Sequence, residues 1–133
     1  MFLDSSFCVD LMREQSRGTE GAAARKLREL IDVPLYVSLF VLCELQAGAQ
    51  YSSSPQRELR KVERFTDSLD VVLPDRAFAV AYGETEAYLR RAGSPIPTMD
   101  LLIGVMAKTW GMSLLARDAS HFSMIPALVL ESY

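Results

Sequence analysis

The sequence is poor in the residues that build soft metal sites, with two cysteines and one histidine among 133 residues. Cys8 and Cys43 are far apart in the chain and lie within apolar runs, so we expect two reduced core residues rather than a zinc or redox pair. Because His121 is the single histidine, a His-rich zinc site is excluded.

Long hydrophobic runs are also missing. The longest uncharged apolar stretch, 33–43, is interrupted by Pro34 and Ser38 and is shorter than the ~20 residues that a membrane-spanning helix needs. The chain begins Met-Phe-Leu-Asp, without a basic region ahead of an apolar one, so we expect no signal peptide, no membrane partner and a cytoplasmic location.

Basic residues are not in excess, since the chain has 14 Lys and Arg and 17 Asp and Glu, which gives a net charge of −3. That balance gives no overall positive field, which by itself argues against a nucleic-acid partner. A composition of 50% hydrophobic and 23% charged residues excludes disordered and disulfide-scaffold proteins. The length predicts a single domain over residues 1–133.

Short apolar segments alternate with helical patterns along the chain. Strands are expected at 1–4, 35–37, 71–73, 113–116 and 128–130, and helices at 7–14, 20–30, 39–49, 56–65, 76–91 and 99–110. The alternation predicts an α/β fold with a mostly parallel sheet covered on both faces. The segment 39–49 is apolar nearly all the way round, which predicts a buried helix, whereas 56–65 is basic and amphipathic.

Acidic residues follow the ends of predicted strands, where parallel sheets bind their ligands. Asp4 closes the first strand, Asp118 follows the strand that ends at Ala116, and Asp100 stands in the first turn of the helix after Thr98. Each acid also has a purely structural explanation: Asp4 and Asp118 as caps, and Asp100 as a partner of the helix dipole.

Glu44 is the only charged residue between Val33 and Gln56. A carboxylate on a buried helix must be protonated, paired with a cation such as an arginine, or bound to a metal ion. Four carboxylates converging at one sheet edge would repel each other unless divalent cations lay between them, and oxygen ligands favour Mg²⁺ or Mn²⁺. Such a site predicts metal-assisted hydrolysis of phosphodiesters.

Four segments carry a resemblance that covers essentially the whole chain: Phe2-Leu3-Asp4-Ser5-Ser6, Cys43-Glu44-Leu45, Asp100-Leu101-Leu102-Ile103, and Leu115-Ala116-Arg117-Asp118 leading to His121-Phe122. In this order they resemble the PIN-domain ribonucleases, in particular the VapC-type toxins of bacterial toxin–antitoxin pairs. The resemblance implies a three-layer α/β/α sandwich with a sheet of four to five strands. It also implies an acidic quartet that binds one or two Mg²⁺ or Mn²⁺ ions and cuts RNA: Asp4, Glu44, Asp100 and Asp118.

Ser5 and Ser6 stand where the family often has Thr and Asn, and Ala116 where it often has Thr. The Ser6 hydroxyl can still donate to a carboxylate or to a metal-bound water. Arg117, beside the fourth acid, is expected to reach a substrate phosphate, whereas His121 is expected to be a turn residue rather than a general base. Further basic residues on the helix 56–65 could steer RNA, although a positive helix face is more often only solvated surface.

The sequence therefore predicts an Mg²⁺-dependent endoribonuclease toxin whose substrate is tRNA or another structured RNA. Its expected partners are a cognate antitoxin and a second copy of the chain in a homodimer. The alternative is a PIN-like module that binds RNA or protein without catalysis. Setting the four proposed ligands aside leaves 13 acids against 14 bases, so the negative net charge is compatible with an RNA substrate.

Overall fold

Five short strands form the central sheet of the computed structural model, which describes residues 1–133. They are β1 (Phe2–Leu3), β2 (Tyr36–Ser38), β3 (Asp70–Val72), β4 (Leu114–Leu115) and β5 (Leu130–Glu131). Their order is β3-β2-β1-β4-β5 and every neighbouring pair is parallel, so β1 is the central strand. This confirms the predicted parallel sheet.

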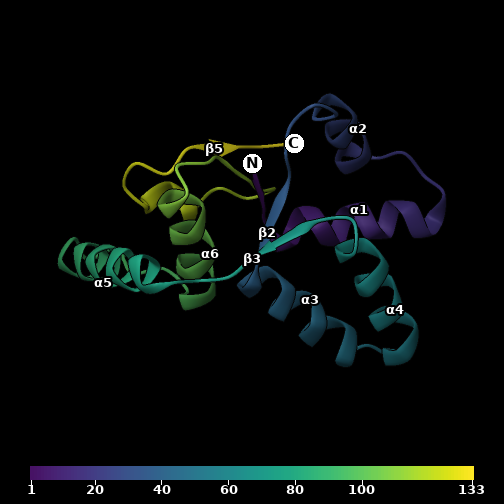
Figure 1. Ribbon diagram of the computed structural model, residues 1–133, viewed down its shortest axis with the longest axis horizontal. Coiled ribbons are helices and arrows are strands. Elements are labelled where there is room, and N and C mark those ends of the chain that lie inside the picture. Colours follow the sequence, from purple (N-terminus) through teal and green to yellow (C-terminus); the bar gives the residue numbers. More distant parts are fainter.

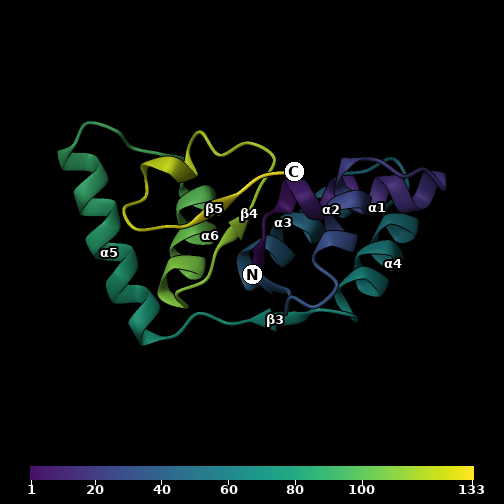
Figure 2. The same cartoon turned by 90° about the horizontal axis from the view of Figure 1, so that it is seen from above.

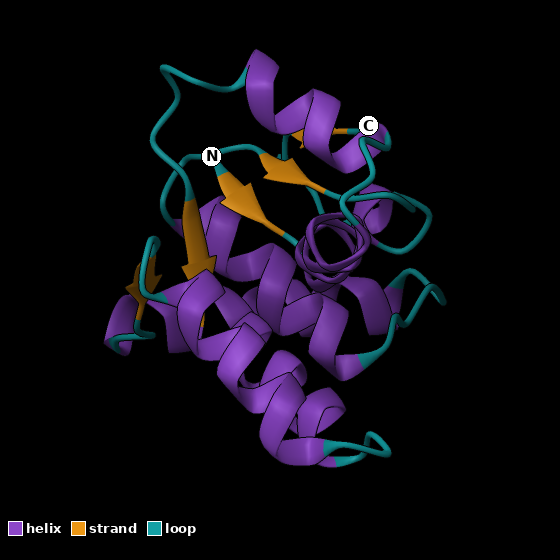
Figure 3. Cartoon of the chain, turned by 90° about the vertical axis from the view of Figure 1, so that its right-hand side faces the viewer, coloured by secondary structure: helices purple, strands orange, loops and turns teal.

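Six helices flank the sheet, and they make up far more of the chain than the strands do (Figure 3). They are α1 (Ser5–Arg17), α2 (Ala22–Glu29), α3 (Leu39–Gln50), α4 (Pro55–Thr66), α5 (Arg76–Arg91) and α6 (Thr98–Thr109), followed by a short 3-10 helix at Phe122–Met124. Figures 1 and 2 show α5 and α6 on one side of the sheet and α1 to α4 on the other. The arrangement is the predicted three-layer α/β/α sandwich.

Side-chain caps explain several of the helix starts. Ser38 accepts a hydrogen bond from the backbone N–H of Val41 at 3.2 Å, and Asp75 accepts one from that of Phe78 at 2.8 Å. The first helix begins at Ser5 with Asp4 as its N-cap, two residues before the predicted start, and runs on to Arg17. Ser5 and Ser6 therefore lie inside the helix.

Two further elements, α6 and β5, begin at other residues than the sequence predicted. α6 begins at Thr98, one residue before the predicted start, with Pro97 at the N-cap position. β5 begins two residues later than expected, since a turn at Pro126-Ala127 with Ala127 at φ 63° precedes it. No helix has the length and apolar composition needed to span a bilayer.

The prediction that the segment 39–49 is a buried helix is wrong for one side of it. In α3 only Val41, Leu45 and Ala49 are buried, whereas Cys43 is exposed to solvent. Three buried positions at four-residue spacing define one stripe along the helix. Phe40 and Leu42, outside that stripe, are half-buried against the core, whereas Ala47 is exposed. Cys43 is therefore not a core residue, while Cys8 is fully buried as predicted.

Candidate active site

Asp4 lies at the carboxyl end of the central strand, where β1 passes into α1. Its side chain is largely buried, with 7% of the residue exposed. One carboxylate oxygen, Oδ2, accepts hydrogen bonds from the backbone N–H of Ser6 at 3.2 Å and from the Ser6 hydroxyl at 2.6 Å. The N-terminal end of α1 and the Ser6 side chain thus fix the orientation of this acid.

Glu44 reaches the same region from α3. It is half-buried, and its carboxylate accepts a hydrogen bond from the Ser5 hydroxyl. Burial raises the pKa of Glu44 above its ordinary value, and the hydrogen bond from Ser5 opposes that rise. The negative charges of Asp4 and Asp100 raise the pKa further, so acids from three separate elements lie close enough to interact.

The structural alternative for Glu44, a buried salt bridge to an arginine, is wrong. None of the ion pairs in the structure involves Glu44 or Asp4. The negative charge at the carboxyl end of β1 is therefore not neutralised by a basic side chain in contact with either residue.

Asp100 stands in the first turn of α6, as predicted, and meets His121. Its Oδ2 lies 2.6 Å from His121 Nδ1. His121 belongs to the turn after β4, as expected from the sequence, but its contact with an acid of the site was not predicted. No local pattern could have indicated it, because the two residues belong to different segments of the chain.

Asp118 lies at the rim of this group rather than inside it. It is exposed, and its Oδ1 accepts a hydrogen bond from the backbone N–H of Ser120 at 2.9 Å. Hydrogen bonding from Ser120 lowers the pKa of Asp118, and the charges of His121 and Arg117 lower it further. Of the four predicted ligands, Glu44 lies within reach of the charges of Asp4 and Asp100. Asp118 interacts instead with Ser120, His121 and Arg117.

The donor set fits a hard divalent cation, since Asp4, Glu44 and Asp100 offer only carboxylate oxygens. No three acidic, histidine or cysteine side chains are arranged to hold one ion together as they stand. Each of the three carboxylates has a hydrogen-bond partner of its own: Ser6 for Asp4, Ser5 for Glu44 and His121 for Asp100. An ionised carboxylate has about four lone-pair sites, so each acid can keep its hydrogen bond and still offer an oxygen to an ion.

A groove of about 520 Å³ lies between α1, α3 and α4 and opens beside Glu44. Glu44 lines it, together with basic residues of two helices: Arg13, Arg17, Arg57 and Lys61. Two of the basic residues predicted on the helix 56–65 thus lie in a groove that leads to the site. The lining combines apolar residues with charges of both signs, because Glu58, which is paired with Lys61, also lines the groove.

A parallel α/β sandwich with acids gathered at the end of its central strand is a fold that known proteins share. Residues 1–127 match the family model described as "PIN domain", and the chain belongs to this family. The tRNA(fMet)-specific endonuclease VapC of Shigella flexneri is 28% identical over 131 residues, which cover 98% of this chain and 96% of the relative.

Ribonuclease VapC1 of Haemophilus influenzae (strain R2866) is 25% identical over 132 residues, covering 98% of this chain and 96% of the relative. Among solved structures, a chain of VapBC2 from Rickettsia felis, crystallised bound to a DNA fragment from its promoter, matches with a TM-score of 0.90 and 26% identity. The match covers 99% of this chain and 97% of that chain.

Proposed function

We propose that the protein is a metal-dependent endoribonuclease of the VapC type and the toxin of a toxin–antitoxin pair. The observation that carries the proposal is the convergence of Asp4, Glu44 and Asp100 at the carboxyl end of β1, with no basic side chain paired to the first two. The names of the relatives, an endonuclease and a ribonuclease, support catalysis over a module that only binds RNA or protein.

The proposed metal ligands are Asp4, Glu44 and Asp100, with Asp118 at the rim as the fourth. Bound Mg²⁺ or Mn²⁺, as one or two ions, would supply positive charge that lowers the pKa of the attacking water and offsets charge on the scissile phosphate. The hydroxyl of Ser6 holds Asp4 in place.

The proposed substrate is RNA, with tRNA the favoured class because the Shigella relative is a tRNA(fMet)-specific endonuclease. An antitoxin partner is supported by the similarity to a VapBC structure. A homodimer and a cytoplasmic location stay predictions from the sequence and the resemblance.

The test is RNA cleavage by the purified protein with and without Mg²⁺. We expect Asp4→Asn and Glu44→Gln each to slow cleavage about 1,000-fold, the size expected for several kcal/mol of lost transition-state stabilisation. Glu86→Gln, on α5, is the matched control and should cleave at the wild-type rate. Undiminished cleavage by both site variants would contradict the proposal.

Two further measurements separate the alternatives. Calorimetric titration with Mn²⁺ should show binding to the wild type and weaker binding to Asp4→Asn. If the wild type binds RNA but binds neither Mn²⁺ nor Mg²⁺, the protein is a non-catalytic module. The biological role is tested by expression in cells, where growth should stop and should resume when a protein encoded by a neighbouring gene is produced with it.

A further inference from the structure

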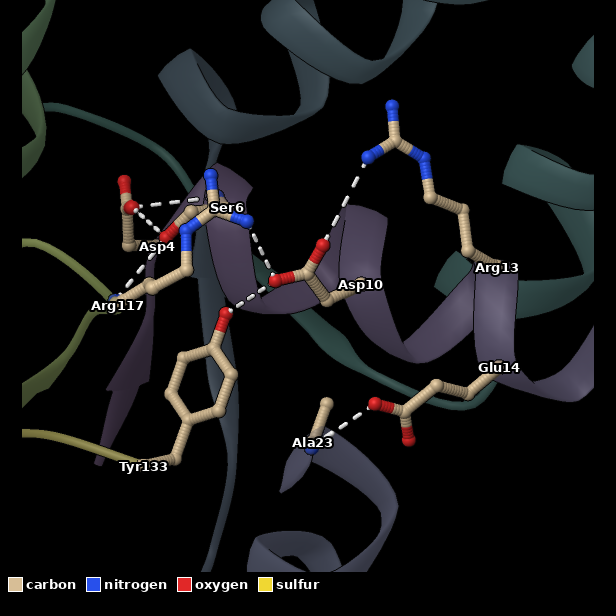
Figure 4. Close-up of polar contacts among 8 residues, drawn as sticks. All are labelled: Asp4, Ser6, Asp10, Arg13, Glu14, Ala23, Arg117 and Tyr133. Carbon is tan, nitrogen blue, oxygen red and sulfur yellow. Dashed lines mark hydrogen bonds and ion pairs between the residues drawn. The ribbon is translucent and has the colours of Figure 1, made fainter. Parts of the chain in front are cut away.

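Asp10 joins three segments of the chain beside the acid cluster (Figure 4). It lies on α1, and its side chain is only 20% exposed. Its Oδ2 accepts hydrogen bonds from Arg117 Nη1 at 2.8 Å and from the Tyr133 hydroxyl at 2.9 Å. Its Oδ1 lies 3.8 Å from Arg13 Nη1. One carboxylate thus links α1 to the loop after β4 and to the segment after β5.

Tyr133 is held by packing as well as by this hydrogen bond. Its ring meets that of Phe7 edge to face, with the ring centroids 4.9 Å apart. Burial raises the pKa of the Tyr133 hydroxyl, and the bond to Asp10 raises it further, so the hydroxyl keeps its proton and acts as a donor. The Asp10 carboxylate is therefore held from one side by an aromatic residue that packs on Phe7 of α1.

Arg117 is fixed at two points. Its backbone N–H donates to Ser6 Oγ at 3.2 Å, and that same hydroxyl donates to Asp4. Its guanidinium donates through Nη1 to Asp10, yet 59% of the side chain is exposed. A guanidinium has five N–H donors in a planar fork that suits phosphate oxygens. With one edge held by Asp10, the exposed remainder of the fork is available to a ligand.

We propose that Asp10 and Tyr133 are positioning residues that aim the guanidinium of Arg117 at a backbone phosphate of the RNA. This rests on the proposed ribonuclease function and adds two residues to it. An arginine held in one orientation loses less conformational freedom when it binds than a mobile one does, so holding it strengthens substrate binding. Because the phosphate contact is made equally in the ground state and the transition state, the expected effect is on KM rather than on kcat.

The test uses Asp10→Asn and Tyr133→Phe in the full chain, with initial rates measured over a range of concentrations of a short cleavable RNA. Asp10→Asn keeps the side-chain shape but removes the charge that holds the guanidinium, and we expect KM to rise about tenfold. Tyr133→Phe keeps the ring on Phe7 and should raise KM about threefold. In both variants kcat should stay within about twofold of wild type.

The direction of the change is itself informative. Removing a negative charge near bound RNA would by electrostatics alone lower KM, so a rise can come only from lost positioning. In an Arg117→Ala background, Asp10→Asn should raise KM no further, since the residue it positions is gone. Matched controls on α5 are Glu86→Gln, which removes the charge of the Arg90 partner, and Tyr88→Phe; both should leave KM unchanged.

An unchanged or lowered KM in Asp10→Asn would overturn the proposal, as would an effect that persists in full without Arg117. A fall in kcat at constant KM would also overturn it, because Asp10 would then act through Ser6 and Asp4. These outcomes are read from a wild-type protein that cleaves RNA. Absence of cleavage by the wild type would instead refute the proposed function.

Discussion

The first turn of α2 is capped by a side chain from another helix, and this makes a quantitative prediction possible. The Glu14 carboxylate on α1 accepts hydrogen bonds from the backbone N–H groups of Gly21, Ala23 and Ala24 at 3.0, 3.2 and 2.8 Å. These N–H groups have no partner within α2, and its N-cap residue, Gly21, has no side chain to offer. Glu14→Ala therefore removes the whole cap.

The expected cost follows from these contacts. Loss of a capping side chain costs about 0.5–2 kcal/mol, and hydrogen bonds to a charged group lie at or above the upper end of that range. Because Glu14 makes three such bonds, we expect the free energy of unfolding to fall by about 2 kcal/mol and Tm to fall by about 8 °C. Glu14→Gln keeps one acceptor oxygen and should lose about half as much.

Urea and thermal unfolding followed by circular dichroism measure this effect, with Glu86→Ala as the control for removing a helical glutamate. Gly21→Ala provides a second, stricter test, because its methyl group would overlap the Glu14 carboxylate and displace the cap. It should destabilise the wild type by about 1 kcal/mol and have no cost in the Glu14→Ala background. A Glu14→Ala variant as stable as Glu86→Ala, or additive effects of the two changes, would refute the reasoning.

Two further predictions concern α3. The pKa of Glu44 is raised in the folded state, so the folded protein binds a proton more readily than the unfolded one. The free energy of unfolding should therefore fall as the pH rises from the ordinary glutamate pKa through the raised value. Glu44→Gln should remove that decline and leave the ligand-free protein more stable at neutral pH than the wild type. Equal pH profiles for both proteins would contradict this. A thiol reagent should label the folded protein once, at exposed Cys43, because Cys8 is buried and burial raises its pKa. Cys43→Ser should abolish labelling until the chain is unfolded, and fast labelling of that variant while folded would show the assignment to be wrong.

Local sequence determined the elements and the position of most candidate ligands. Alternation of apolar segments and helical patterns predicted the parallel sheet, and Ser38 and Asp75 cap their helices as such residues do at helix starts. Asp4 ends the central strand, and Glu44 stood out because no other charge lies near it in the chain. These features depend on period, spacing and composition, all of which a single sequence contains.

Contacts between distant segments were decided only by the tertiary structure. The hydrogen bond between His121 and Asp100, and the link from Asp10 to Arg117 and Tyr133, join residues that no periodicity relates. Helix composition likewise could not show which side of α3 is covered by the rest of the chain. Hydrophobic and capping patterns act within a few residues, whereas the neighbours of a side chain depend on how helices pack and where loops turn. The scarcity of histidine and cysteine left carboxylates as the candidate ligands, and only the packing shows that Glu44 lies within reach of the charges of Asp4 and Asp100 while Asp118 is exposed.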